Sequence, residues 1–160
     1  MHIFGLYIYG MNLAFLARCM LLALLVWSAL WRASGRRPRL RRALRAINGA
    51  LALVAVYGIL DRTVLGRAPS DQHTFVLASG ITSEEFAREM FMNALLYFPL
   101  GLTLTAVVGP WSVAVGLLIS QGVEAWQYAA GTGLSQGTDV LCNALGCAIG
   151  ALPYARVPRA

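Results

Sequence analysis

Long apolar stretches separated by short polar segments define the pattern of this chain. Each stretch approaches the roughly 20 residues that an α-helix needs to cross a lipid bilayer. The alternation of apolar and polar residues that is typical of membrane β-barrels is not visible. We therefore predict an all-α fold, a polytopic transmembrane helical bundle of about five spans. The predicted spans cover residues 11–31, 43–60, 90–108, 111–128 and 138–154.

The segments between the spans carry turn-forming residues, and we treat the whole chain, residues 1–160, as a single domain. Residues 61–89 form the longest polar segment, and a capping pattern at residues 82–85 predicts a short helix that leads into the third span. The apolar patch at residues 74–77 is a candidate to return toward the bundle. Gly109-Pro110 predicts a tight turn, and residues 129–137 a loop.

Composition supports the membrane assignment and sets the orientation. Hydrophobic residues make up 58% of the chain and charged residues 12%, against about 25% charged residues in typical soluble domains. The chain has no lysine, and seven of its arginines crowd a predicted loop at residues 32–45, in which Gly35 and Pro38 are helix breakers. Such a loop is expected to be cytoplasmic and is suited to attract anionic lipid headgroups. The arginines are Arg32, Arg36, Arg37, Arg39, Arg41, Arg42 and Arg45.

This orientation places residues 61–89 and 129–137 outside and the arginines near the C-terminus inside. We do not expect nucleic-acid binding, because the arginines are not spread over a soluble face. Cys19, Cys142 and Cys147 all lie in predicted helices, and the two histidines are far apart. No disulfide, metal site or cofactor is therefore predicted.

Five polar side chains lie inside the last three predicted spans. A charged group at the centre of a bilayer costs about 2.5–3.5 kcal/mol on insertion scales, so such residues indicate function. With the predicted topology and about 1.5 Å of rise per residue, all five lie within roughly 8 Å of the outer boundary. We therefore predict one shared polar cavity that opens away from the cytoplasm. The ligand-binding candidates are Asn93, Glu124, Gln127, Asp139 and Asn143.

Helical spacing supports this convergence. Glu124 and Gln127 are three residues apart, and Asp139 and Asn143 are four apart, so each pair shares one helix face. Packing on these faces brings the two carboxyl groups toward one another. Two close carboxylates do not both ionise cheaply, so one holds a proton or a cation lies between them.

Arg18 is a further ligand-binding candidate, because the predicted first span brings it to a similar depth as the five polar residues. Arg62 or Arg88 from the polar segment can serve as the cation instead. Gly146 and Gly150 form a small-xxx-small pair, which permits close approach between helices.

A purely structural explanation competes with this prediction. Amides such as Asn93 and Gln127 often join membrane helices through hydrogen bonds, each of which contributes about 0.6 kcal/mol on average. Asp139, at the start of its predicted span, also interacts favourably with the helix dipole. Glu124 fits this explanation poorly, because an acid is a costly way to join two membrane helices.

Three short motifs follow one another within residues 90–154. They are Asn93-Ala-Leu-Leu-Tyr-Phe-Pro99-Leu-Gly101, Glu124-Ala-Trp-Gln127 and Asp139-Val-Leu-Cys-Asn143-Ala-Leu-Gly146. Their order and spacing resemble the VanZ-like membrane family, which is named for a glycopeptide (teicoplanin) resistance protein. The resemblance implies a multi-pass protein of the bacterial inner membrane with a role in the cell envelope or in antibiotic resistance. It implies no established catalytic mechanism.

One departure from the family pattern concerns charge. The family usually has an arginine between the second and third motifs, whereas residues 131–137 of this chain contain none. If that arginine contacts a ligand, Arg18, Arg62 or Arg88 has to replace it here.

Three functions remain open. The first is binding of an envelope lipid, a lipid-linked intermediate or a glycopeptide in the outward-facing cavity, so that membrane lipids or lipid-linked envelope precursors are the expected partners. The second is a hydrolase or transferase that acts on a lipid-linked substrate, with Glu124 and Asp139 as catalytic acid and base. The third is a small carrier or assembly subunit. A carrier is expected to place its acids near the bilayer midplane, and the predicted depth of these acids disfavours it.

Overall fold

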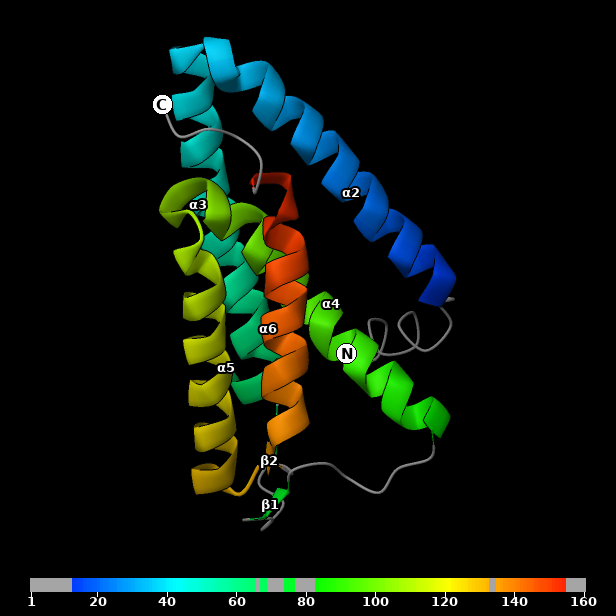
Figure 1. Cartoon of the computed structure of the whole chain (residues 1–160). Helices are drawn as coiled ribbons and strands as arrows, with labels where there is room; N and C mark the ends of the chain where they lie inside the picture. The colour runs from blue at the N-terminus through cyan, green and yellow to red at the C-terminus, as the bar shows by residue number, and fades with distance from the viewer. Residues whose placement is uncertain (1–12, 66, 69–73, 77–82, 133–134, 155–160) are drawn as a thin grey trace.

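The structure, a computed structural model, describes residues 13–65, 67–68, 74–76, 83–132 and 135–154, and within them the chain is almost entirely helical (Figure 1). This confirms the predicted all-α fold. Two strands of two residues each, β1 (Phe75–Val76) and β2 (Ser135–Gln136), pair in parallel. The apolar patch at residues 74–77 thus returns, where it is described, to the loop before the last helix. Within the described residues there are five α-helices, which are α2 (Leu13–Ala33), α3 (Pro38–Leu60), α4 (Ser83–Val108), α5 (Trp111–Ala130) and α6 (Gly137–Ala151).

Among the described residues, three helical stretches are long and apolar enough to cross a membrane: Phe15–Ala33, Pro38–Leu65 and Ala87–Val108. They correspond to the first three predicted spans. The predicted fourth and fifth spans are helices of 20 and 15 residues, α5 and α6. The membrane character and the five helices agree with the prediction, and the number of membrane crossings stays a prediction.

Fewer residues of the basic segment, residues 32–45, lie in a loop than predicted. A 3-10 turn, η1 (Ser34–Arg36), follows α2, and α3 then begins at Pro38. Proline suits the first position of a helix, because it lacks the N–H group that would have no partner there. Arginine is a good helix former, so Arg39, Arg41, Arg42 and Arg45 continue the helix. The prediction of a loop through residue 45 is therefore wrong, and Pro38 starts a helix instead of breaking one.

The predicted short helix at residues 82–85 and the third span form one continuous helix, α4, with Pro99 inside it. Membrane helices tolerate proline where neighbouring groups satisfy the backbone. The carbonyl oxygen that loses its N–H partner is that of Leu95, four residues before Pro99. Separately, the Thr103 hydroxyl donates a hydrogen bond of 2.8 Å to the Pro99 carbonyl oxygen one turn later. Gly109, with a positive φ of 67°, ends the helix in the predicted turn before Pro110 and α5.

Glycine permits α4 and α6 to lie in close contact. A methyl group on Gly146 would collide with the backbone carbonyl group of Ala94, and one on Gly101 would collide with the backbone of Cys147. Gly150 lies equally close to the backbone of α4 at Phe98. The predicted small-xxx-small contact is therefore present. The core lies beside it and consists of Ile59, Tyr97, Leu100, Val123 and Cys147.

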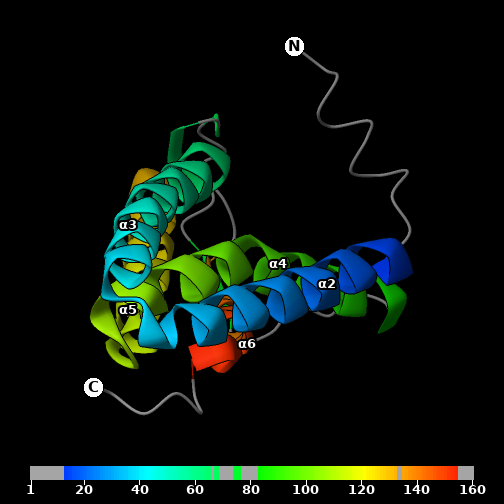
Figure 2. The same cartoon turned by 90° about the horizontal axis from the view of Figure 1, so that it is seen from above.

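Helix α2 diverges from α3 after the turn that joins them (Figure 1 and Figure 2). Only 6% of its most apolar window is buried. It is held at its C-terminal end, where Trp27 Nε1 donates a hydrogen bond of 2.7 Å to the hydroxyl of Tyr154 in the 3-10 turn η3 (Leu152–Tyr154). That hydroxyl donates in turn to the Leu102 carbonyl oxygen at 2.7 Å. Residues 1–12, including the predicted start of the first span at residue 11, lie outside the described part.

Candidate functional site

A polar cavity of about 140 Å³ lies at the end of the bundle that carries β1 and β2 (Figure 1). It is formed by the start of α4, the end of α5, the start of α6 and the π-helical turn η2 (Asp61–Leu65) that extends α3. The structure brings all five predicted polar side chains to this cavity. Its lining residues are Thr63, Arg67, Glu89, Asn93, Leu96, Val123, Glu124, Gln127, Gln136, Asp139 and Asn143.

Glu124 is buried, with 7% of its surface exposed, and it is fixed by the chain that follows its own helix. Its Oε2 atom accepts a hydrogen bond of 2.9 Å from the backbone N–H of Gln136. Gly131, with φ of 61°, ends α5 in a left-handed conformation that allows the chain to reverse. The pairing of β1 with β2 then holds residues 135–136 beside the cavity. One carboxylate oxygen of Glu124 is thereby engaged by the protein itself.

Gln127 links α5 to the extension of α3. Its Nε2 atom donates a hydrogen bond of 2.9 Å to the backbone carbonyl oxygen of Thr63. The last carbonyl groups of a helix have no intrahelical partner, and Thr63 lies in the π-helical turn that ends α3. Such turns occur frequently at functional sites. The amide of Gln127 therefore closes one wall of the cavity.

Two buried amide atoms in the cavity lining have no hydrogen-bond partner within the described residues. Asn143 donates from Nδ2 to the Ser120 hydroxyl at 2.9 Å, but its buried Oδ1 accepts nothing. Asn93 interacts with the Asp139 carboxyl group, although its buried Nδ2 atom forms no hydrogen bond of standard geometry. A buried polar atom left unpaired costs about 1–3 kcal/mol and is rare in folded proteins. The Oδ1 atom of Asn143 is therefore a free acceptor for a polar occupant.

The cavity has an excess of acidic groups. Three carboxyl groups, those of Glu89, Glu124 and Asp139, line it together with one guanidinium, that of Arg67. The Asp139 carboxyl group interacts electrostatically with the other three charged groups. Because carboxyl groups outnumber the guanidinium group around the cavity, the cavity favours a cationic group. No set of three or more His, Cys, Asp or Glu side chains suited to a metal ion occurs in the part of the chain that is described.

None of the three arginines named from the sequence as the possible cation lines the cavity. Arg18 is exposed on α2, which diverges from the bundle, and does not line the cavity. Neither Arg62 nor Arg88 lines it, and the arginine that does is Arg67. Arg67 lies two residues past η2, where no helical periodicity exists to indicate its direction. The loop between the second and third motifs, where the resemblance leads one to expect an arginine, contains none, and Arg67 lines the cavity from a position before the first motif.

Three further polar lining residues were not singled out from the sequence. Glu89 is the last residue of the predicted polar segment, but α4 begins at Ser83, and Glu89 therefore lies one turn before Asn93 on the same helix face. That i,i+4 spacing was the available signal. Thr63 and Gln136 contribute through their backbone atoms, which no side-chain pattern reveals.

The apolar helices and the polar cavity define the class of protein, a helical membrane protein with acidic side chains around an internal cavity. The family model described as VanZ/LLP1 matches residues 15–157. The chain therefore belongs to the VanZ/LLP1 family, as the three sequence motifs indicated. No match was found among curated proteins or among solved structures.

Proposed function

We propose that this VanZ-type membrane protein binds the headgroup of an envelope lipid or lipid-linked intermediate in the acidic cavity. The observation that carries the proposal is the combination of an unpaired buried amide oxygen, Oδ1 of Asn143, with three carboxyl groups and one arginine around a single cavity. Interhelical hydrogen bonding explains the bonds that Gln127 and Asn143 donate. It does not explain the unpaired amide oxygen or the surplus of carboxyl groups around the cavity.

The lining indicates the chemistry of the headgroup. A surplus of carboxyl groups attracts a primary amine and accepts hydrogen bonds from hydroxyl groups. Arg67 is exposed, so it is suited to meet a phosphate at the rim of the cavity. A volume of about 140 Å³ corresponds to a few water molecules at about 30 Å³ each, which suits a headgroup and not a whole glycopeptide. An amine-bearing phospholipid headgroup meets all three conditions.

The proposed location is the outer side of the bacterial inner membrane. Most arginines of the chain lie around the α2–α3 turn, at the opposite end of the bundle from the cavity (Figure 1). The excess of positive charge is expected at the cytoplasmic end, so the cavity faces outward. Binding there relates the protein to the cell envelope and to the glycopeptide (teicoplanin) resistance for which the family is named.

A binding titration with matched carboxylate variants tests this function. Purified protein in detergent is titrated with short-chain phosphatidylethanolamine, and bound lipid is measured by native mass spectrometry. Glu124→Gln removes a lining carboxylate, whereas Asp61→Asn removes an exposed carboxylate that does not line the cavity. We expect Glu124→Gln to weaken binding by roughly tenfold, because a charge-assisted hydrogen bond contributes about 1.5–3 kcal/mol, and Asp61→Asn to leave it unchanged. Equal binding by all three proteins contradicts the proposal.

A second candidate function is hydrolysis or group transfer on a lipid-linked substrate. It is favoured by one observation, the electrostatic interaction of Asp139 with Glu124 across the same cavity. Two carboxyl groups in different environments are a common acid and base pair. Incubation of the purified protein with radiolabelled lipid-linked precursors separates the two functions. An enzyme converts the precursor and loses this activity in Asp139→Asn, whereas a binding protein returns it unchanged.

A further inference from the structure

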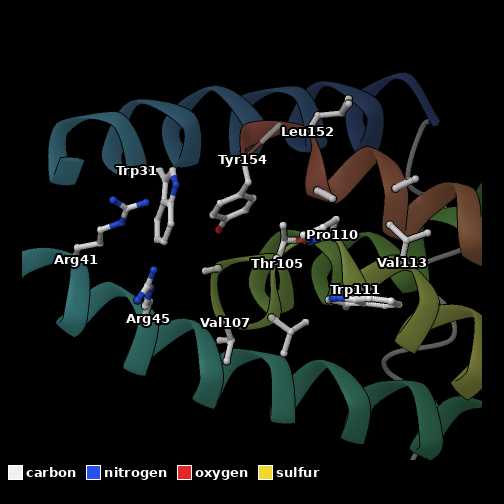
Figure 3. Close-up of a pocket in the computed structure, with 15 residues that line it drawn as sticks. Trp31, Arg41, Arg45, Thr105, Val107, Pro110, Trp111, Val113, Leu152 and Tyr154 are labelled. Atoms are coloured by element: carbon white, nitrogen blue, oxygen red, sulfur yellow. The ribbon is translucent and has the colours of Figure 1, made fainter. Parts of the chain in front are cut away.

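A second, larger cavity of about 640 Å³ lies at the other end of the molecule and has the opposite chemistry (Figure 3). It is bounded by the end of α2, the start of α3, the turn between α4 and α5, and the end of α6 with η3. No carboxylate is found among its lining residues. The side chains used below are Trp31, Arg41, Arg45, Trp111 and Tyr154.

Two arginines supply the charge of this cavity. Arg41 and Arg45 are four residues apart on α3 and therefore lie on one helix face, and Figure 3 shows both directed toward Trp31. The Arg41 guanidinium lies 5.2 Å from the centroid of the Trp31 ring, a cation–π distance that fixes its position. The Nε atom of Arg41 is buried and has no hydrogen-bond partner in the described part of the chain.

The acids whose side chains the structure describes lie away from these arginines, and Glu89, Glu124 and Asp139 line the cavity at the other end of the bundle. All acidic residues of the chain follow residue 60, and the first of them is Asp61. Asp61 lies about 30 Å from Arg41 along α3 and its extension, at 1.5 Å of rise per residue. The positive charge of the cavity is therefore available to an anion from outside the protein.

Aromatic rings place the cavity at the level of lipid headgroups. Trp31, Trp111 and Tyr154 line it, and tryptophan and tyrosine are enriched where the bilayer meets water. Tyr154 packs edge-on against Trp31, with ring centroids 4.8 Å apart, and its hydroxyl is held between Trp27 and Leu102. The wall is thus fixed by bonds within the protein. Next to it, the exposed side chains of Leu30 and Ile47 offer an apolar surface to acyl chains.

We propose that this cavity binds the phosphate group of an anionic phospholipid, with Arg41 and Arg45 as the phosphate ligands and the apolar faces of α2 and α3 in contact with its acyl chains. A fork of guanidinium N–H donors matches the geometry of a phosphate. The site is separate from the acidic cavity in its residues, its charge and its position. Arg41 and Arg45 thereby act as more than topology signals within the arginine cluster.

Paired arginine variants test this site by native mass spectrometry of the whole protein in detergent. Wild type is titrated with short-chain phosphatidylglycerol and with short-chain phosphatidylcholine. The test variant is Arg41→Gln/Arg45→Gln, and the control is Arg39→Gln/Arg42→Gln. The control loses the same charge from the same helix, at exposed residues that do not line the cavity. We expect wild type to prefer phosphatidylglycerol, the test variant to lose roughly tenfold or more in affinity, and the control to lose much less.

If the double variant does not fold, the single variant Arg45→Gln replaces it, because the Arg45 side chain is exposed and its substitution should not disturb folding. We expect Arg45→Gln to bind phosphatidylglycerol more weakly than its control, Arg42→Gln. Equal losses in test and control variants, or equal binding of both lipids by wild type, overturn the proposal. Inorganic phosphate that displaces the lipid at equal concentration also overturns it, because the site then recognises a free anion. Glu124→Gln should leave phosphatidylglycerol binding unchanged, so failure at one cavity is distinguishable from failure at the other.

Discussion

The carboxylate of Glu124 accepts a hydrogen bond of 2.9 Å from the backbone N–H of Gln136. This contact joins the end of α5 to the chain that enters α6, across a loop of few residues. It has two effects, because it satisfies a buried donor and it holds Glu124 at the wall of the acidic cavity. The two effects are separable by the choice of substitution.

Replacement of Glu124 by alanine should destabilise the protein more than replacement by glutamine. Alanine leaves the Gln136 N–H buried without an acceptor, at a cost of about 1–3 kcal/mol. Glutamine keeps an acceptor oxygen in the same place and should cost well under half of that. Thermal unfolding of both purified variants measures the difference. Equal midpoints would show that the hydrogen bond contributes nothing to stability.

Close approach of α4 and α6 should make Gly146 intolerant of substitution. In Gly146→Ala the new methyl group meets the backbone of Ala94, so the helices must separate, at an expected cost of several kcal/mol. Gly122→Ala is the matched control, since nothing lies within 4 Å of its added methyl group. That control should be neutral or stabilising by up to about 1 kcal/mol. Unfolding midpoints that move equally in the two variants would contradict the packing described here.

Gln127 should hold the extension of α3 in place. Gln127→Ala removes the hydrogen bond to the Thr63 carbonyl oxygen, so backbone amides of residues 61–68 should exchange with deuterium faster than in wild type. Gln121→Ala, at an exposed position of the same helix, is the control and should leave exchange there unchanged. The experiment is read by mass spectrometry of peptides that cover these residues. Unaltered exchange in Gln127→Ala would mean that other contacts fix the segment.

Single cysteines should report the orientation of the chain in the membrane. In a background without the exposed Cys19, we expect Ala68→Cys to react with a membrane-impermeant maleimide on intact cells. We expect Arg39→Cys to react only after the membrane is permeabilised, because arginine-rich segments face the cytoplasm. Labelling of Arg39→Cys on intact cells would reverse the orientation and place the acidic cavity inside.

Much of this architecture was predictable from the sequence because membrane helices must satisfy their own backbone, and apolar length then fixes where they lie. The convergence of Asn93, Glu124 and Asp139 was predictable for a related reason. In antiparallel helices, a residue near the end of one lies at the depth of a residue near the start of the next. The spacing of the motifs along the sequence therefore predicts where the cavity lies.

Other features depended on contacts that periodicity does not encode. Arg67 follows the last turn of α3, and its direction is set by the path of an irregular segment. Arg18 does not reach the cavity, because α2 diverges from the bundle, and the apolar pattern of this helix does not reveal what it packs against. Pro38 was read as a breaker, although the same residue suits the first turn of a helix.

The most direct measurement of the central claim locates a bound headgroup on the chain. A phosphatidylethanolamine analogue with a photoreactive group at its headgroup is incorporated with the purified protein, irradiated, and mapped by peptide mass spectrometry. We predict adducts within residues 89–96 and 123–139, reduced in Glu124→Gln and unchanged in Asp61→Asn. Adducts spread over the exposed faces of α2 and α3, or unaffected by Glu124→Gln, would contradict a headgroup site in the acidic cavity.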